Sequence, residues 1–259
     1  MQNDKINLSL IIPIGLMLFS FFFGAGNLIF PPVLGQMAGE NISWGMLGFC
    51  LSGVGFPLLG VLTMAMKQSD NPDSIAMPMH PLYARAVTIL CALAIGPLFA
   101  IPRTAAVSFD TGIHSLLPAS CEAIGLPVYT VFFFVLTYFF SINPSKIIGH
   151  IGKFLSPMLL ICLAVLVVCV FVNPTGSLKM PNPDFAASPF FRGFQEGYNT
   201  MDLLAAILFG SITIKAIEAQ GITDKKVLTK LCSYAGLIAA FFLAIILSLI
   251  HISEPTRPY

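Results

Sequence analysis

Long apolar stretches, separated by short connectors rich in turn-forming residues, dominate the pattern of the chain. About 20 mostly apolar residues cross the hydrocarbon core of a bilayer as a helix. The predicted spans are 8–34, 43–66, 86–108, 128–143, 154–172, 198–217 and 231–250. No alternating pattern of about ten residues indicates the strands of a barrel, and only helices and closed barrels satisfy the backbone in lipid. The pattern therefore predicts an all-α membrane protein.

Composition strengthens this prediction. Hydrophobic residues make up 56% of the 259 residues and charged residues only 10%, whereas a soluble domain carries about 25% charged residues. Mean hydropathy is +0.87. These values exclude a cytosolic enzyme and a disordered chain, and the net charge of +1 offers no basic surface for nucleic acid. We expect the lipid bilayer as a partner and no nucleic acid, while the oligomeric state is not indicated.

The six cysteines show no pattern of metal or disulfide chemistry. None has C-x-x-C spacing and no histidine cluster accompanies them. We interpret them as small buried residues, and we expect no metal site beyond Na⁺ and no cofactor.

Lysine and arginine positions predict the orientation of the spans. With the N-terminus inside, nine of these residues fall on the cytoplasmic side and two outside before the last residues, as the positive-inside rule requires. The inner set is Lys5, Lys67, Arg85, Lys146, Lys153, Lys215, Lys225, Lys226 and Lys230, and the outer set is Lys179 and Arg192. The sequence thus predicts a multi-pass protein of the cell (inner) membrane with a cytoplasmic N-terminus.

The last residues look foreign to the rest of the chain. Residues 247–257 read Leu-Ser-Leu-Ile-His-Ile-Ser-Glu-Pro-Thr-Arg, which resembles the translation of the transposon-end adapter used in DNA sequencing libraries. We therefore expect native sequence to end near Ile246 and residues 247–259 to be a non-native tail. On this interpretation the chain is an N-terminal fragment, truncated after about seven transmembrane helices and inactive in transport.

The first span contains helix breakers near its middle. Gly24 and Gly26 weaken the helix, and Pro31 and Pro32 remove backbone donors. A break at membrane depth persists only where protein or a polar cavity satisfies the backbone. Its freed carbonyls can hold Na⁺, and the amide end of the next half-helix can hold a carboxylate. Asn27 would add a side-chain oxygen, although a glycine packing face with a proline kink is the alternative.

The sixth span contains a second interruption. Gly197 precedes a helix start at which Asn199, as N-cap, and Asp202 resemble a capping box. Asp202 is then a helix-start carboxylate, with the lining of a transport path as the alternative, since ionisable residues are costly at membrane depth. Breaks in the first and sixth spans are typical of transporters built from repeats of five helices.

Arg103 lies inside the third predicted span. An arginine at this depth must face protein or water. We expect it to pair with Asp110 or with a backbone carbonyl, and we favour this structural role over contact with a substrate.

Three long motifs carry a family resemblance. Residues 22–32, 95–104 and 196–202, together with the shorter 152–157, resemble the branched-chain amino acid transport system II carriers of bacteria, the LIVCS family. The resemblance covers residues 1–246, as the N-terminal part of a single transmembrane transporter domain, the first repeat plus helices six and seven. It implies a broken-helix, five-plus-five inverted-repeat fold. It also implies Na⁺-coupled symport of leucine, isoleucine and valine into the cell, with Na⁺ as coupling ion.

The same resemblance implies the site residues. Those expected to bind the amino acid are Gly24, Ala25, Gly26, Tyr198, Asn199 and Thr200. Those expected to bind the ion are Ser20 and Phe23, through their backbone, and Asn27. Phe21, Phe22 and Phe23 would either wall an apolar pocket or face lipid.

Other functions remain as alternatives. An H⁺-coupled carrier, or a permease for another amino acid or amine, is the nearest. A seven-helix receptor or sensor is an alternative of another class, against which the inside position of the N-terminus argues. An enzyme is not expected, because the sequence contains no H-E-x-x-H motif, paired intramembrane aspartates or activated serine.

Overall fold

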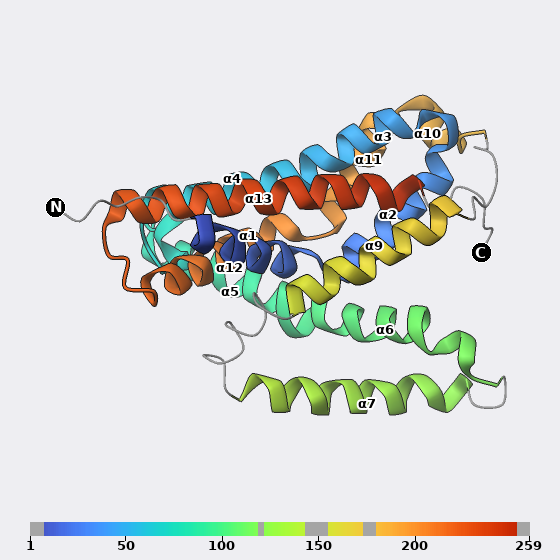
Figure 1. Cartoon of the computed structure of the whole chain (residues 1–259), viewed down its shortest axis with the longest axis horizontal. Helices are drawn as coiled ribbons and strands as arrows, with labels where there is room; N and C mark the ends of the chain where they lie inside the picture. Colours follow the sequence, from blue (N-terminus) through green and yellow to red (C-terminus); the bar gives the residue numbers. More distant parts are fainter. Residues whose placement is uncertain (1–7, 119–121, 143–154, 173–179, 253–259) are drawn as a thin grey trace.

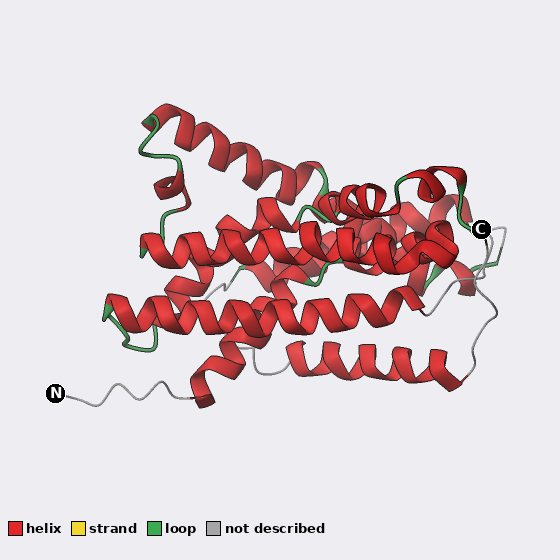
Figure 2. Ribbon diagram, turned by 90° about the horizontal axis from the view of Figure 1, so that it is seen from above, coloured by secondary structure: helices red, strands yellow, loops and turns green. Residues whose placement is uncertain are grey.

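The computed structural model describes residues 8–118, 122–142, 155–172 and 180–252, and the regular elements within these ranges are helices (Figure 2). The first four predicted spans contain α1 (Leu8–Phe22) and α2 (Ala25–Ala38), α3 (Ile42–Cys50) and α4 (Phe56–Lys67), α5 (Pro81–Leu93) and α6 (Ala100–Gly112), and α7 (Glu122–Ser141). The last three contain α9 (Ser156–Val172), α11 (Pro189–Asn199) and α12 (Asp202–Glu218), and α13 (Lys225–Ile252). A short helix, α10 (Pro183–Ala187), precedes α11.

The lengths and apolar composition of these helices suit a membrane. Among the described residues, four helical segments are long and apolar enough to cross one, namely Ala25–Lys67, Pro81–Gly112, Ile124–Ser141 and Lys225–Ile250. The pair α11 and α12, bent by 45°, makes a fifth if it is one broken span, while Leu10–Phe22 and Ser156–Cys169 are shorter apolar helices. The prediction of an all-α, multi-pass architecture is confirmed. The inverted repeat and the count of seven spans stay predictions.

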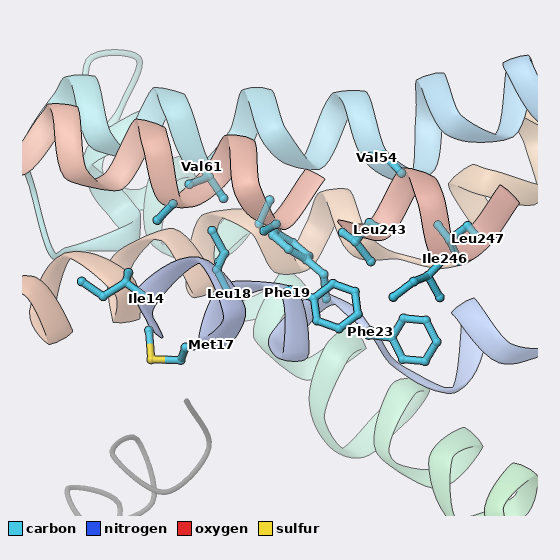
Figure 3. Close-up of a cluster of buried hydrophobic side chains, with 14 of the residues drawn as sticks. Ile14, Met17, Leu18, Phe19, Phe23, Val54, Val61, Leu243, Ile246 and Leu247 are labelled. Carbon is cyan, nitrogen blue, oxygen red and sulfur yellow. The ribbon is translucent and has the colours of Figure 1, made fainter. Parts of the chain in front are cut away.

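Helix α1 lies at the centre of the bundle and packs against α13 and α12 (Figure 1). Leu18 and Phe19 of α1 are fully buried, and they face Val61 of α4 and Leu243 of α13 in the core that Figure 3 shows. Because lipid is as apolar as these side chains, close packing rather than exclusion of water holds such helices together.

The periphery presents apolar side chains outward. Helices α6 and α7 run side by side along one flank (Figure 1), and the segment Ile124–Ser141 buries none of its residues. The expectation that the cysteines are buried holds for Cys232 but is wrong for Cys162 and Cys169, which are exposed on α9. An outward apolar face needs no burial in protein when lipid covers it, so small apolar residues are tolerated there.

Basic residues of the predicted inner set meet at one end of the bundle. Lys215 at the end of α12 lies 3.7 Å from Asp70, just beyond α4. The Gln68 side chain donates to the carbonyl of Lys225, at the start of α13, at 3.3 Å. These contacts place the ends of α4 and α12 and the start of α13 at the same end of the bundle. The assignment of that end to the cytoplasm stays a prediction.

Several predictions fall on residues outside the described ranges. These are the placements of Lys5, Lys146, Lys153, Lys179 and Cys121, the motif at 152–154, and the last part of the tail, 253–259. The predicted boundary near Ile246 falls inside α13, where Leu247 is fully buried, and it stays a prediction.

Candidate binding site at two helix breaks

The first predicted break is present between α1 and α2. Helix α1 ends at Phe22, Gly24 is extended at φ −108° and ψ −172°, and α2 begins at Ala25 without a side-chain cap. The backbone N–H of Asn27 donates to the Gly24 carbonyl at 3.1 Å. The last carbonyls of α1 and the first amides of α2 therefore lack partners within their own helices and point toward the break.

Prolines remove two backbone donors from α2. Pro31 and Pro32 lie inside α2, where they cannot donate to the carbonyls of Asn27 and Leu28 four residues earlier. Both carbonyls point along α2 toward its C-terminal end, because helix carbonyls have this direction, so they add no acceptor at the break itself.

The second break lies between α11 and α12, a few residues later than predicted. Helix α11 ends at Asn199, Met201 adopts a left-handed conformation with φ 67°, and α12 begins at Asp202. The Thr200 hydroxyl donates to the Gly197 carbonyl at 2.8 Å and lies 3.4 Å from the amide nitrogen of Asp202, which donates to it.

The predicted capping box at this position is wrong. Helix α11 continues through Gly197 to Asn199, so Asn199 is a helical residue rather than an N-cap. Its side-chain amide donates to Glu196 at 3.4 Å instead. The expected placement of Asp202 at a helix start is correct.

Helix α11 packs closely on α3 through Gly193 and Gly197, a contact that we call the glycine seam. Added Cβ atoms at Gly193 would lie 2.5 Å from the carbonyl carbon and 2.8 Å from the Cα of Gly45, so only glycine permits this approach of two backbones. At Gly197 a Cβ would contact the backbone of the same helix α3. The hydroxyl of Ser52, which follows α3, donates to the Phe194 carbonyl at 2.7 Å and closes the seam.

The two breaks touch each other through Gly26 and Asn27. A Cβ at Gly26 would lie 3.2 Å from the Cα of Thr200, so α2 approaches the second break closely. The Asn27 side-chain nitrogen donates to the Asp202 carboxylate at 2.9 Å and to the Phe22 carbonyl at 2.6 Å. Asn27 is 1% exposed and Asp202 7% exposed. One amide therefore joins the end of α1, the start of α2 and the start of α12.

The Asn27 side-chain oxygen is the unusual atom in this arrangement. It is buried, and it has no hydrogen-bond partner in the described part of the chain. Buried polar atoms are normally paired, and an unpaired one costs free energy. The oxygen is thus available to a ligand that supplies a cation or a donor.

A cavity of about 200 Å³ opens where the breaks meet. Its polar lining comes from Asn27, Arg103, Thr104, Thr200 and Asp202, and its apolar lining includes Phe21, Phe22, Ile95, Ile101 and Phe209. A water molecule takes about 30 Å³ in the liquid, so the cavity has the size of a small organic molecule. A mostly apolar pocket with a few placed polar groups is typical of a ligand site.

Arg103 reaches this cavity from α6. Its guanidinium donates to the Asn199 carbonyl at 3.1 Å, at the negative end of α11. Its Cζ also lies 5.6 Å from the centroid of the Phe30 ring, in cation–π range. Of the two predicted partners, the backbone carbonyl is the correct one. The same contact holds the charge at the wall of the cavity.

The structure brings together five of the residues expected from the resemblance. Gly24, Ala25, Gly26, Asn27 and Thr200 all line the cavity. Of the phenylalanines, Phe21 and Phe22 line it as well, and their rings pack on Phe209 at 5.2 and 5.5 Å between centroids.

The other four expected residues do not line the cavity, and the expected roles of the Ser20 and Phe23 backbones stay predictions. The Ser20 hydroxyl donates to Ser156 of α9 at 2.7 Å, and the Phe23 ring packs on Phe19 at 5.5 Å. The side chains of Tyr198 and Asn199 are exposed and do not line the cavity. Successive helical residues point about 100° apart, so a run of neighbours cannot share one face.

Arg103 and Phe209 line the cavity but were not among the expected site residues, and Asp202 was expected to line a transport path only as the alternative to its role at the helix start. A charge at membrane depth is the sequence signal that marks Arg103 and Asp202. No local signal marks Phe209, because its role depends on the packing of α12 against α1.

The comparisons with known proteins point to one family. A family model described as branched-chain amino acid transport protein matches residues 7–254. The chain is 44% identical to the branched-chain amino acid permease BrnQ of Bacillus subtilis, over 94% of the chain and 56% of that permease. It is 38% identical to the branched-chain amino acid transport system 3 carrier protein of Pseudomonas aeruginosa, over 91% of the chain and 53% of that carrier. No solved structure matches the chain.

The chain spans about half the length of the curated relatives it matches. These relatives are named as permeases and carriers, which are not enzymes, and this agrees with the expectation drawn from the sequence. The resemblance in the motifs around the two breaks is confirmed by the match over nearly the whole chain. The chain therefore belongs to the branched-chain amino acid transport protein family.

Proposed function

We propose that the chain forms the substrate site of a Na⁺-coupled symporter that brings leucine, isoleucine and valine into the cell. The observation that carries the proposal is the cavity at the junction of two broken helices, within a member of this transport family. Broken helices at mid-membrane are the places where carriers of this architecture bind substrate and ion. Breaks in the first and sixth predicted spans also favour the five-plus-five inverted repeat.

The lining of the cavity suits a branched aliphatic amino acid. Phe21, Phe22 and Phe209 form an aromatic wall that offers a dry surface to an aliphatic side chain. The start of α2 offers unpaired amides to a carboxylate. An apolar pocket separates ligands that differ by one methylene by only about 1–3 kcal/mol, so the three branched amino acids should share the site.

Na⁺ coupling is supported by the oxygen atoms at the first break. Asn27 Oδ1 is buried and unpartnered within the described residues, and the end of α1 presents backbone carbonyls beside it. Such carbonyls coordinate Na⁺ in broken-helix carriers. If the ion and the amino acid occupy neighbouring positions, each raises the affinity of the other by the same factor.

Leucine binding by the purified 259-residue chain tests the proposal. The chain is placed in lipid nanodiscs, and the Kd of radiolabelled leucine is measured in NaCl and in KCl of equal ionic strength. We expect a lower Kd in NaCl, competition by isoleucine and valine, and none by lysine or glutamate. Equal Kd values in the two salts, with a Kd that changes with pH, would favour the H⁺-coupled alternative. Absence of leucine binding would contradict the proposal.

The membrane orientation is tested separately. Topology reporters fused after Lys67 or Lys226 should lie in the cytoplasm, and those after Glu122 or Gly176 outside. A cytoplasmic reporter at Glu122 would contradict the predicted inside position of the N-terminus.

A further inference from the structure

Two side chains of opposite charge reach the cavity from different helices. Asp202 begins α12 and Arg103 lies on α6, and they are the ionisable residues among the described lining. In the described part of the chain each is held by neutral groups rather than by the other. Asn27 donates to Asp202, and Arg103 donates to the Asn199 carbonyl. Neither charge is thus neutralised by a described side chain within the site.

The surroundings of Asp202 suit a cationic ligand group. An ionised carboxylate accepts about four hydrogen bonds, and the described side chains that interact with this one are Asn27, which donates at 2.9 Å, and the Thr200 hydroxyl. The side chain of Asn27, which donates to Asp202, also carries a buried oxygen, Oδ1. This oxygen has no hydrogen-bond partner among the described residues. A charge buried at membrane depth is costly without a counter-charge. The charged carboxylate matches an ammonium group with its three N–H donors, and Asn27 Oδ1 beside it stays available to the coupling ion.

The surroundings of Arg103 suit an anionic ligand group. A guanidinium carries five N–H donors in a planar fork that matches a carboxylate, and one donor is used within the described part of the chain. Gly24 and Ala25, at the N-terminal end of α2, line the same cavity. The positive end of a helix adds to the attraction of an anion.

We propose that Asp202, oriented by Asn27, binds the α-ammonium group of the amino acid while Arg103 and the start of α2 bind its carboxylate. The aliphatic side chain then contacts the wall of Phe21, Phe22 and Phe209. This assignment rests on the proposed function for the identity of the ligand, and it adds the orientation of that ligand. A site with one negative and one positive group is neutral as a whole, and so is a zwitterion.

The assignment also gives a rule of selectivity. A ligand that lacks the ammonium group leaves the buried Asp202 without a counter-charge, and one that lacks the carboxylate leaves the half-buried Arg103 without one. Sites built to pair polar groups reject analogues that lack them far more strongly than apolar pockets reject a missing methylene.

The test compares three ligands of the same carbon skeleton type. Leucine carries both charged groups, 4-methylpentanoate carries only the carboxylate, and 3-methylbutylamine carries only the amine. Their Kd values are measured in saturating NaCl on the unmodified chain in nanodiscs and on Asp202→Asn and Arg103→Gln. Asp110→Asn is the matched control, because Asp110 is an exposed residue of α6 outside the cavity lining.

We expect Asp202→Asn to weaken leucine and 3-methylbutylamine by about tenfold or more, as for loss of a charged hydrogen bond. Binding of 4-methylpentanoate should be unchanged or stronger, because the variant removes the charge that this ligand leaves unpaired, and this binding also shows that the variant is folded. Arg103→Gln should weaken leucine and 4-methylpentanoate and spare the amine. Asp202→Glu should retain part of the leucine affinity, and the Asp110→Asn control should match the unmodified chain.

Three results would overturn the assignment. Equal loss of all three ligands by Asp202→Asn would give Asp202 a role in the fold of the site alone. Unchanged leucine binding would remove it from the site. A higher Na⁺ requirement with an unchanged order of ligands would assign Asp202 to the coupling ion. Failure of the unmodified chain to bind leucine is a separate result, which would contradict the proposed function itself.

Discussion

The two helix breaks serve the same cavity but are built in different ways. At the first, Gly24 is extended and uncapped, and an added Cβ there would have only the Phe22 carbonyl oxygen nearby, at 3.9 Å. At the second, the Thr200 hydroxyl closes the turn. The half-helix α11 before it is seated on α3 through glycines at backbone contact distance. The first break is open and neutral, whereas the second is braced and carries the buried charge.

This difference predicts different roles for the two breaks. Hinges that absorb conformational change are short segments with few constraints, and the first break fits this description. The second break holds Asp202 in a fixed place against the rest of the bundle. The hydrogen bond from Asn27 to Asp202 joins the two, so an ion that binds at Asn27 is in a position to affect the ligand at Asp202.

The glycine seam provides the largest expected effect. Gly193→Ala would place a Cβ against the backbone of Gly45, where no flexible side chain can move away. Overpacking costs about 1–3 kcal/mol and sometimes more, and we expect the upper end, about 3 kcal/mol, because backbone must shift. The measurement is thermal unfolding of the purified chain in detergent.

The control for the seam is Gly112→Ala, at the end of α6, where nothing lies within 4 Å of an added Cβ. Its melting temperature should equal or slightly exceed that of the unmodified chain, because alanine reduces the freedom of the unfolded chain. A Gly193→Ala variant as stable as this control would show that α11 is not held by the seam.

Asn27→Ala tests the link between the breaks. The variant removes a buried oxygen and the bonds to Phe22 and Asp202. We expect the Na⁺ concentration for half-maximal leucine binding to rise by about tenfold, the equivalent of one charge-assisted contact. Leucine affinity should fall at low Na⁺ and largely recover at saturating Na⁺, because the two affinities are linked.

A second result separates this role from capping. If Asn27 acts only as a helix-end residue, its loss should cost about 1 kcal/mol of stability and leave the Na⁺ dependence of the folded protein unchanged. Leucine binding against Na⁺ concentration, normalised to folded protein, distinguishes these cases.

The sequence predicted the breaks because their signals are local. Glycines and prolines marked the interruption near Gly24, and Asp202 was correctly placed at a helix start. The apolar stretches also located the helices, since membrane depth fixes their length. Asn27 was expected at the site because it is a polar residue beside a break in an apolar span.

The expected site residues that do not line the cavity are placed by tertiary contacts. Ser20 faces Ser156 rather than the cavity, and this depends on where α9 packs. Tyr198 and Asn199 were expected in the lining, but α11 extends to Asn199 and turns them outward. Arg103 reaches the cavity only because α6 passes the end of α11. No periodicity in the sequence encodes these approaches.

Thr200→Val tests how much the hydroxyl contributes to the braced break. The variant keeps the shape of the side chain but removes the bond to the Gly197 carbonyl and the acceptor for the Asp202 amide. We expect a loss of about 1 kcal/mol in the free energy of unfolding. Thr213→Val is the matched control, because Thr213 is also buried and, among the described residues, its hydroxyl donates to the Phe209 carbonyl four residues earlier in α12. A similar loss in both variants would mean that the break gains nothing special from its hydroxyl.

Gly24→Ala has the smallest expected effect, and its sign is informative. The φ of −108° and ψ of −172° at Gly24 are open to any residue, and an added methyl group has space around it. Loss of freedom in the unfolded chain should then stabilise the protein by about 0.4–1 kcal/mol. If the first break is a hinge that passes through other backbone conformations, the same variant should slow leucine association while leaving the melting temperature equal or higher. Melting and stopped-flow association measurements on one preparation give both values. A lower melting temperature would mean that Gly24 is needed for packing. The description of the first break as open, in contrast to the braced second break, would then be wrong.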